Sequence, residues 1–62
     1  MNEKVIRNIA FRMSTKELIE ECQRLKRLAE KTDERKLRGD IRRFRSILVT
    51  ELKSRQMKLK GF

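Results

Sequence analysis

The feature that most limits how this chain can fold is the stretch from Ile9 to Leu18, where the spacing of apolar residues changes. Up to Met13 apolar side chains recur at every second position, and beyond it they recur at helical spacing. Because the side chains of a strand alternate between its two faces, this pattern predicts a short strand over residues 5–13. One face would carry Ile9, Phe11 and Met13, and the other would carry Asn8, Ala10 and Arg12.

A helix is predicted to begin directly after this strand. Ser14 is a favourable N-cap, and Glu17, three residues later, completes the pattern of a capping box. Met13 and Leu18 have the spacing to pack across this cap as a hydrophobic staple. The first helix is therefore predicted over residues 14–31, with its apolar face at positions 18, 19, 22, 25, 28 and 29.

A second helix is predicted over residues 33–58, where it includes a basic extension. An eight-residue step separates the last apolar position of the first helix from the first apolar position of the second, and it breaks the helical rhythm. We therefore place a turn near residues 31–33. Gly39 and Asp40 offer an alternative turn, since glycine often ends a helix and aspartate often caps one. The apolar face of the second helix passes through Leu37, Ile41, Phe44, Leu48 and Leu52.

The N-terminal segment also permits a second interpretation. Residues 4–13 can alternatively form a helix, because their apolar side chains also fit helical spacing at Val5, Ile6, Ile9, Ala10 and Met13. The β-branched residues of this segment, together with Phe11, favour the strand. We therefore expect the strand and keep the helix as its alternative.

The chain has 62 residues, so we expect residues 1–62 to form a single small domain. Domains of this size usually need a disulfide, a metal or oligomerisation to supplement a small core. Cys22 is the only cysteine and histidine is absent, so neither an internal disulfide nor a conventional zinc site is expected. Oligomerisation is therefore the expected source of additional stability. The single thiol, which we expect in the core, fits a reducing cytoplasm.

The net charge of +9 indicates an acidic partner such as nucleic acid. No uncharged run approaches the roughly 20 apolar residues that span a bilayer, and no signal peptide is expected. Four arginines of the second helix, spaced three, four and three residues apart, form one basic stripe: Arg35, Arg38, Arg42 and Arg45. This stripe can bind phosphates, and its alternative role is that of an ordinary solvated helix surface.

The sequence around the first cap resembles the ribbon-helix-helix (Arc/MetJ-like) family of bacterial, phage and plasmid repressors. The similarity covers about residues 7–31 and is carried by Ile9 to Ser14, Glu17 to Glu21, Leu25, Leu28 and Ala29. It implies a mainly α fold, with a short N-terminal strand followed by two helices. It also implies an intertwined homodimer in which the paired strands enter the major groove of DNA.

The resemblance implies that Asn8, Ala10 and Arg12 contact base edges and that Ile9, Phe11 and Met13 close the core. Arginine can bind guanine, asparagine can bind adenine, and alanine can contact the methyl group of thymine. The turn departs from the family pattern, because Asp33 and Glu34 stand where a phosphate would approach. Phosphate contacts are expected from Arg7, Thr32, Arg35, Arg38, Arg42 and Arg45.

The predicted function is that of a sequence-specific DNA-binding transcriptional regulator of the repressor type. We expect a cytoplasmic homodimer or higher oligomer that binds double-stranded DNA. No enzymatic activity, catalytic residue, metal, cofactor, small-molecule substrate or membrane partner is expected. Two alternatives stay open, namely a basic hairpin that binds RNA and a helical hairpin that regulates by binding another protein. The latter resembles short bacterial kinase inhibitors of the sporulation checkpoint at Met13-Ser14, Leu18-Ile19-Glu20, Phe44 and Glu51-Leu52-Lys53.

Overall fold

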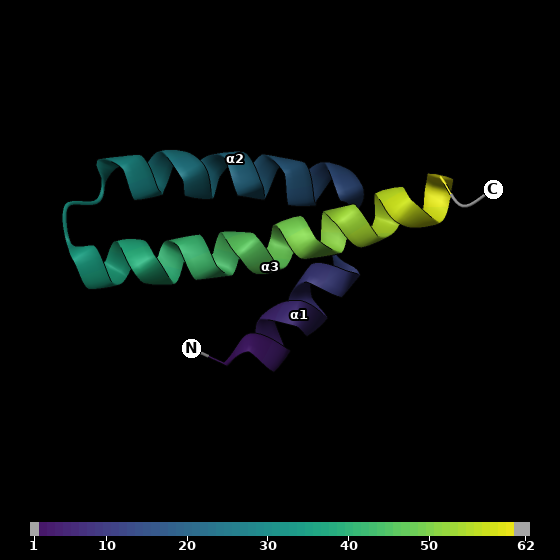
Figure 1. Cartoon of the computed structure of the whole chain (residues 1–62), viewed down its shortest axis with the longest axis horizontal. Coiled ribbons are helices and arrows are strands. Elements are labelled where there is room, and N and C mark those ends of the chain that lie inside the picture. The colour runs from purple at the N-terminus through teal and green to yellow at the C-terminus, as the bar shows by residue number, and fades with distance from the viewer. Residues whose placement is uncertain (1, 61–62) are drawn as a thin grey trace.

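The computed structural model describes the backbone of residues 2–60 and the side chains of residues 2–56. It contains three helices, α1 (Glu3–Arg12), α2 (Thr15–Lys31) and α3 (Arg35–Lys60). Figure 1 shows α2 and α3 side by side as an antiparallel hairpin, with α1 on another side of α3. Because α3 has 26 residues and α2 has 17, the C-terminal part of α3 extends beyond the hairpin (Figure 1).

The strand predicted over residues 5–13 is wrong, since residues 5–12 belong to α1, Met13 is its C-cap, and residues 2–60 contain no strand. Asn2 caps the helix, and its Oδ1 accepts hydrogen bonds from the backbone N–H groups of Lys4 at 3.1 Å and Val5 at 3.4 Å. Ile6 and Ala10, one helical turn apart, are both buried. The expected ribbon-helix-helix fold, including its intertwined homodimer, depends on that strand and is therefore wrong as well.

The capping box predicted at the start of α2 is confirmed. Ser14 Oγ accepts a hydrogen bond from the Glu17 N–H at 3.1 Å, and Glu17 Oε1 accepts one from the Ser14 N–H at 3.2 Å. From this cap the apolar face of α2 continues through its buried residues, which are Leu18, Cys22, Leu25 and Ala29. Ile19 and Leu28, which were expected on the same face, are largely exposed.

Residues 32–34 connect α2 to α3, at the position predicted for the turn. Thr32 is the C-cap of α2, and its Oγ1 donates a hydrogen bond to the Leu28 carbonyl oxygen at 2.6 Å. The alternative turn at Gly39 and Asp40 is wrong, because both residues lie within α3.

The core lies where α2 faces α3, and Ala10 of α1 completes it. Leu18 and Leu48 are the largest fully buried side chains, and they belong to different helices. Met13, Phe44, Val49 and Leu52 pack against this core from its edge. The core cluster consists of Ala10, Leu18, Cys22, Leu25, Ala29, Ile41 and Leu48.

None of the helices described for this chain is long and apolar enough to cross a membrane.

Candidate functional site

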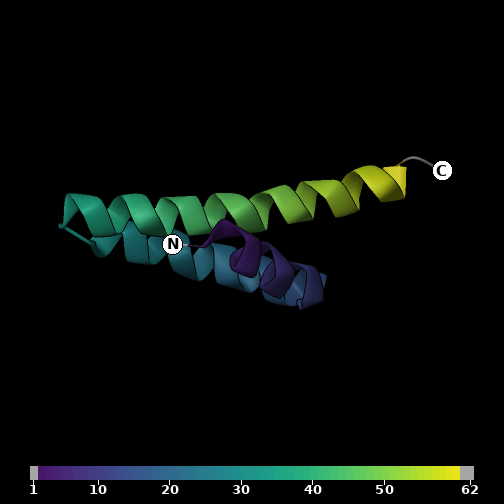
Figure 2. The same cartoon turned by 90° about the horizontal axis from the view of Figure 1, so that it is seen from below.

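One side of α3 is free of the other two helices. Figure 2 shows α1 and α2 both below α3, so that its upper side is uncovered along the helix. The buried residues Ile41 and Leu48 face the hairpin core, and the residues that point away from them are exposed or half-buried. We name this set the free face of α3; it consists of Arg35, Lys36, Arg38, Gly39, Asp40, Arg42, Arg43, Ser46, Thr50 and Lys53. At its two edges it borders the other helices, because Arg43, Ser46 and Thr50 also line a groove beside α1, and Arg38 and Arg42 line a groove beside α2.

The free face is strongly basic and contains several small side chains. It holds six basic residues and one acidic residue, Asp40. Gly39, Ser46 and Thr50 lie between the basic residues. Because their side chains are small, the surface of the helix is recessed at these positions. At 1.5 Å per residue, the face extends over about 27 Å from Arg35 to Lys53. Its dimensions and charge suit contact with an extended polyanion.

The predicted arginine stripe lies along the edge of the free face nearest α2. Between the two helices is a groove of about 410 Å³, lined by Lys26, Ala29 and Glu30 of α2 and by Arg38, Arg42 and Arg45 of α3. Four of these lining residues are cations and only Glu30 is a carboxylate. Within residues 2–56, no arginine of the stripe forms an ion pair, whereas Arg7, Arg24, Arg43 and Arg55 do.

Arg45 is the innermost arginine of the stripe. Its Nε is covered by protein and has no hydrogen-bond partner among the described residues. Its charge reaches Cys22 of α2, where burial raises the pKa of the thiol and the positive charge of Arg45 opposes that rise in pKa. Arg45 therefore lies at the boundary between the core of the hairpin and its basic groove.

No family model, curated protein or solved structure matches this chain. The function therefore has to be argued from its own side chains. Among the described residues, no group of three or more histidine, cysteine, aspartate or glutamate side chains is arranged to hold a metal ion.

The residues predicted to contact base edges do not form one surface. Ala10 is only 1% exposed and belongs to the core. Asn8 and Arg12 are exposed and, being four residues apart, share one side of α1, whereas Ala10 lies two residues from each and faces another side of the helix. The geometric basis for base contacts from these three positions, which was the alternation of a strand, is therefore lost.

The six residues predicted to contact phosphates lie in three different parts of the molecule. The four arginines of the stripe share one side of α3. Arg7 lies on α1, where its Nη2 is 3.8 Å from Oε2 of Glu3. Thr32 lies in the turn, and its hydroxyl hydrogen is donated to Leu28. Sequence reasoning missed Lys26, although its position directly after the buried Leu25 was a signal that it would flank the hairpin groove.

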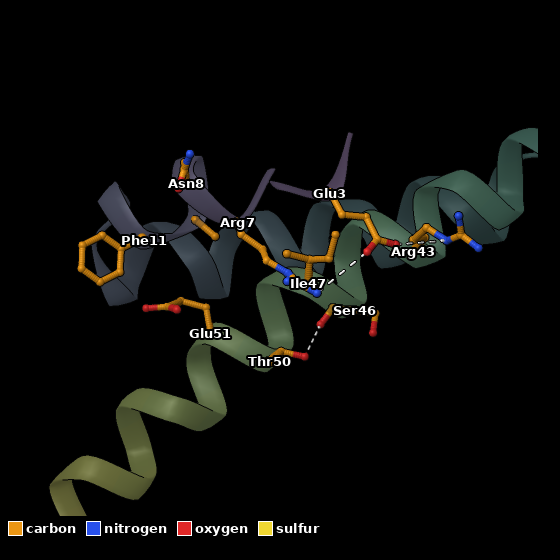
Figure 3. Close-up of a pocket in the computed structure, with 10 residues that line it drawn as sticks. Glu3, Arg7, Asn8, Phe11, Arg43, Ser46, Ile47, Thr50 and Glu51 are labelled. Carbon is orange, nitrogen blue, oxygen red and sulfur yellow. Dashed lines mark hydrogen bonds and ion pairs between the residues drawn. The ribbon is translucent and has the colours of Figure 1, made fainter. Parts of the chain in front are cut away.

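A second groove, of about 690 Å³, lies between α1 and α3. Figure 3 shows Glu3 between Arg7 and Arg43, and Oε1 of Glu3 is 3.8 Å from Nε of Arg43. Phe11 stands at the other end of this groove and is 71% exposed, although it was predicted in the core. This groove thus has mixed charges and an exposed aromatic ring, and it shares Arg43, Ser46 and Thr50 with the edge of the free face.

Proposed function

We propose that this protein binds double-stranded DNA through the free face of α3. The observation that carries the proposal is the arginine stripe, whose four guanidinium groups share one side of α3 without ion-pair partners in residues 2–56. Contacts of lysine and arginine with phosphates supply most of the affinity in non-specific DNA binding. Lys26 adds a fifth cation from α2, at the groove beside the stripe.

The shape of the basic surface favours duplex DNA over duplex RNA. The major groove of B-form DNA is about 12 Å wide and admits an α-helix. The major groove of A-form RNA is deep and narrow, so side chains do not reach its bases. In DNA, Arg42 and Arg43 can each donate two hydrogen bonds to a guanine, and Ser46 can bond to several bases. Sequence specificity is thus proposed for α3 rather than for α1.

We place the protein, as part of this proposal, among transcriptional regulators of the repressor type. A protein that binds a promoter blocks transcription by occupying it, so DNA binding through the free face would be sufficient for this role. A cytoplasmic location belongs to the same proposal, because Cys22 is a free thiol.

Fluorescence anisotropy of a short labelled duplex, measured across a salt titration, tests the proposal. In the wild type, the logarithm of the binding constant should fall linearly with the logarithm of the salt concentration. A variant with Arg38→Gln, Arg42→Gln and Arg45→Gln should bind more weakly, and its slope should be smaller by about 0.9 for each lost phosphate contact. Circular dichroism should show that the variant keeps its helices.

A matched control removes the same charge from elsewhere on the molecule, by Lys4→Gln, Lys16→Gln and Arg24→Gln. These residues lie on α1 and α2, so this variant should keep a salt slope much closer to that of the wild type. If both triple variants lose affinity equally, net charge and not the free face determines binding. If the wild type binds an RNA hairpin and not the duplex, the basic RNA-binding hairpin is the better account.

The alternative of protein binding has its own supporting observation, the exposed ring of Phe11 in the groove between α1 and α3. A second copy of the chain is the occupant that would also account for the expected homodimer. Sedimentation of the wild type and of Phe11→Ser tests this, since the substitution should dissociate such a dimer. A wild type that stays monomeric at high concentration would remove this candidate.

A further inference from the structure

A small hollow on the free face of α3 surrounds Gly39. It has a volume of about 310 Å³ and is lined by Arg35, Arg38, Gly39 and Arg42. Three of the four lining residues carry a positive charge, and no carboxylate lines the hollow. The arginines lie four residues before, one before and three after the glycine, so they surround the place where its side chain is missing.

The packing of the protein gives no reason for a glycine at this position. A Cβ atom built on Gly39 meets no atom within 4 Å, so alanine would fit without displacing anything. The backbone gives no reason either, since Gly39 lies inside α3 and no described glycine has a positive φ. Glycine is less favourable in a helix than every residue except proline. Gly39 therefore weakens α3 without an internal compensation.

The charges around Gly39 also weaken the helix. Arg38 and Arg42 are one turn apart, and like charges at this spacing repel each other. Arg35 is the first residue of α3, whose first turn holds no acidic residue, so it lies at the positive end of the helix dipole. Features that reduce stability without a structural reason are expected at functional sites.

We propose that this hollow, the Gly39 hollow, binds a phosphate group. Arginine binds phosphate through charge-assisted and often bidentate hydrogen bonds, and three guanidinium groups around one cavity can share its oxygens. The missing side chain lets the phosphate approach the helix more closely than a larger residue would allow. The bound phosphate would also separate the like charges of the three arginines. This inference deepens the proposed function, because it names the place where the DNA backbone is held.

A steric series at Gly39 tests the inference, with a labelled DNA duplex and inorganic tripolyphosphate as the two probes. Gly39→Ala should raise Tm of the free protein by roughly 3 to 8 °C, because alanine favours a helix and nothing obstructs its Cβ. Gly39→Leu fills the hollow, and its affinity for each probe should fall by roughly tenfold, equivalent to the loss of one strong contact. Gly39→Ala should lie between wild type and Gly39→Leu in affinity.

Ser54→Leu is the matched control, since Ser54 is exposed on α3 and does not line the hollow. Its affinities should equal those of the wild type. If the wild type binds the duplex and Gly39→Leu binds it as well as Ser54→Leu does, the inference is overturned while the proposed function stands. If tripolyphosphate binds and the duplex does not, and Gly39→Leu loses tripolyphosphate, the hollow binds free phosphates and the proposed function fails. If neither probe binds the wild type, both proposals fail.

Discussion

Arg55 of α3 donates a hydrogen bond from Nη2 to the carbonyl oxygen of Met13, at 2.7 Å. The same Nη2 is 3.2 Å from the carbonyl oxygens of Ala10 and Phe11, so one guanidinium group satisfies the C-terminal end of α1. Nη1 donates to Thr15 Oγ1 at 3.2 Å, at the start of α2. Arg55 therefore joins all three helices at the corner where α1 meets α2.

Arg55→Ala is expected to lower the free energy of unfolding by about 1.5 to 3 kcal/mol, since it removes charged hydrogen bonds and leaves partly buried carbonyl groups unsatisfied. Arg55→Lys keeps the charge but loses the planar fork, so it should restore only part of the stability. Urea denaturation measures both effects. Arg24→Ala is the control, because within residues 2–56 the Arg24 guanidinium forms hydrogen bonds and an ion pair with Glu21 of its own helix and with no other residue, on the exposed surface of α2. Equal midpoints for Arg55→Ala and the wild type would show that α1 is held by other contacts.

Phe11→Ala is expected to change the stability by no more than about 0.5 kcal/mol, because the ring is 71% exposed. Leu18→Ala, at a fully buried position of the core, should cost about 2 to 5 kcal/mol. Thermal unfolding followed by circular dichroism compares the two variants. A large loss of stability in Phe11→Ala would mean that the ring is buried in solution, as the strand interpretation requires.

Ser14→Ala removes the side-chain half of the capping box and should destabilise the protein by about 1 kcal/mol. Ser14→Asp keeps an acceptor for the Glu17 N–H and adds a negative charge at the start of α2, so it should keep most of the stability. The measurement is the midpoint of urea denaturation for the three proteins. Identical midpoints for Ser14→Ala and the wild type would indicate that the cap is replaced by water.

The Cys22 thiol should make the stability depend on alkaline pH. Burial raises the pKa of this thiol in the folded protein, so above the ordinary pKa of cysteine, about 8.5, the unfolded chain loses the proton first. The folded state then binds more protons than the unfolded state, and the stability falls as the pH rises. Urea denaturation between about pH 7 and pH 10 should show this fall.

Cys22→Ala is the control for this pH dependence. Its stability at neutral pH should be lower because a buried side chain is shortened, but its decline with pH should be shallower than that of the wild type. Parallel declines in the two proteins would assign the effect to other groups.

Local patterns of the sequence were sufficient to predict α2. Ser14 and Glu17 are three residues apart, so the capping box that they form needs no distant contact. The eight-residue step from Ala29 to Leu37 likewise predicted the turn, because a single uninterrupted helix would not keep one buried face across it. The arginine stripe was also predictable, since residues spaced three and four apart share one side of any helix.

The tertiary structure decided the conformation of residues 5–13, for which local spacing fitted both a strand and a helix. A strand needs a partner for its backbone groups, whereas a helix satisfies them internally. The helix buries Ile6 and Ala10, and Arg55 satisfies the carbonyl groups at its end from a position 42 residues away from Met13. The tertiary structure also decided that Lys26 lines the groove between α2 and α3, and that no residue of α2 lines the Gly39 hollow. Local sequence determined α2, for which the capping box and the apolar spacing agree, and contacts between distant residues decided between the two conformations that local spacing left open for residues 5–13.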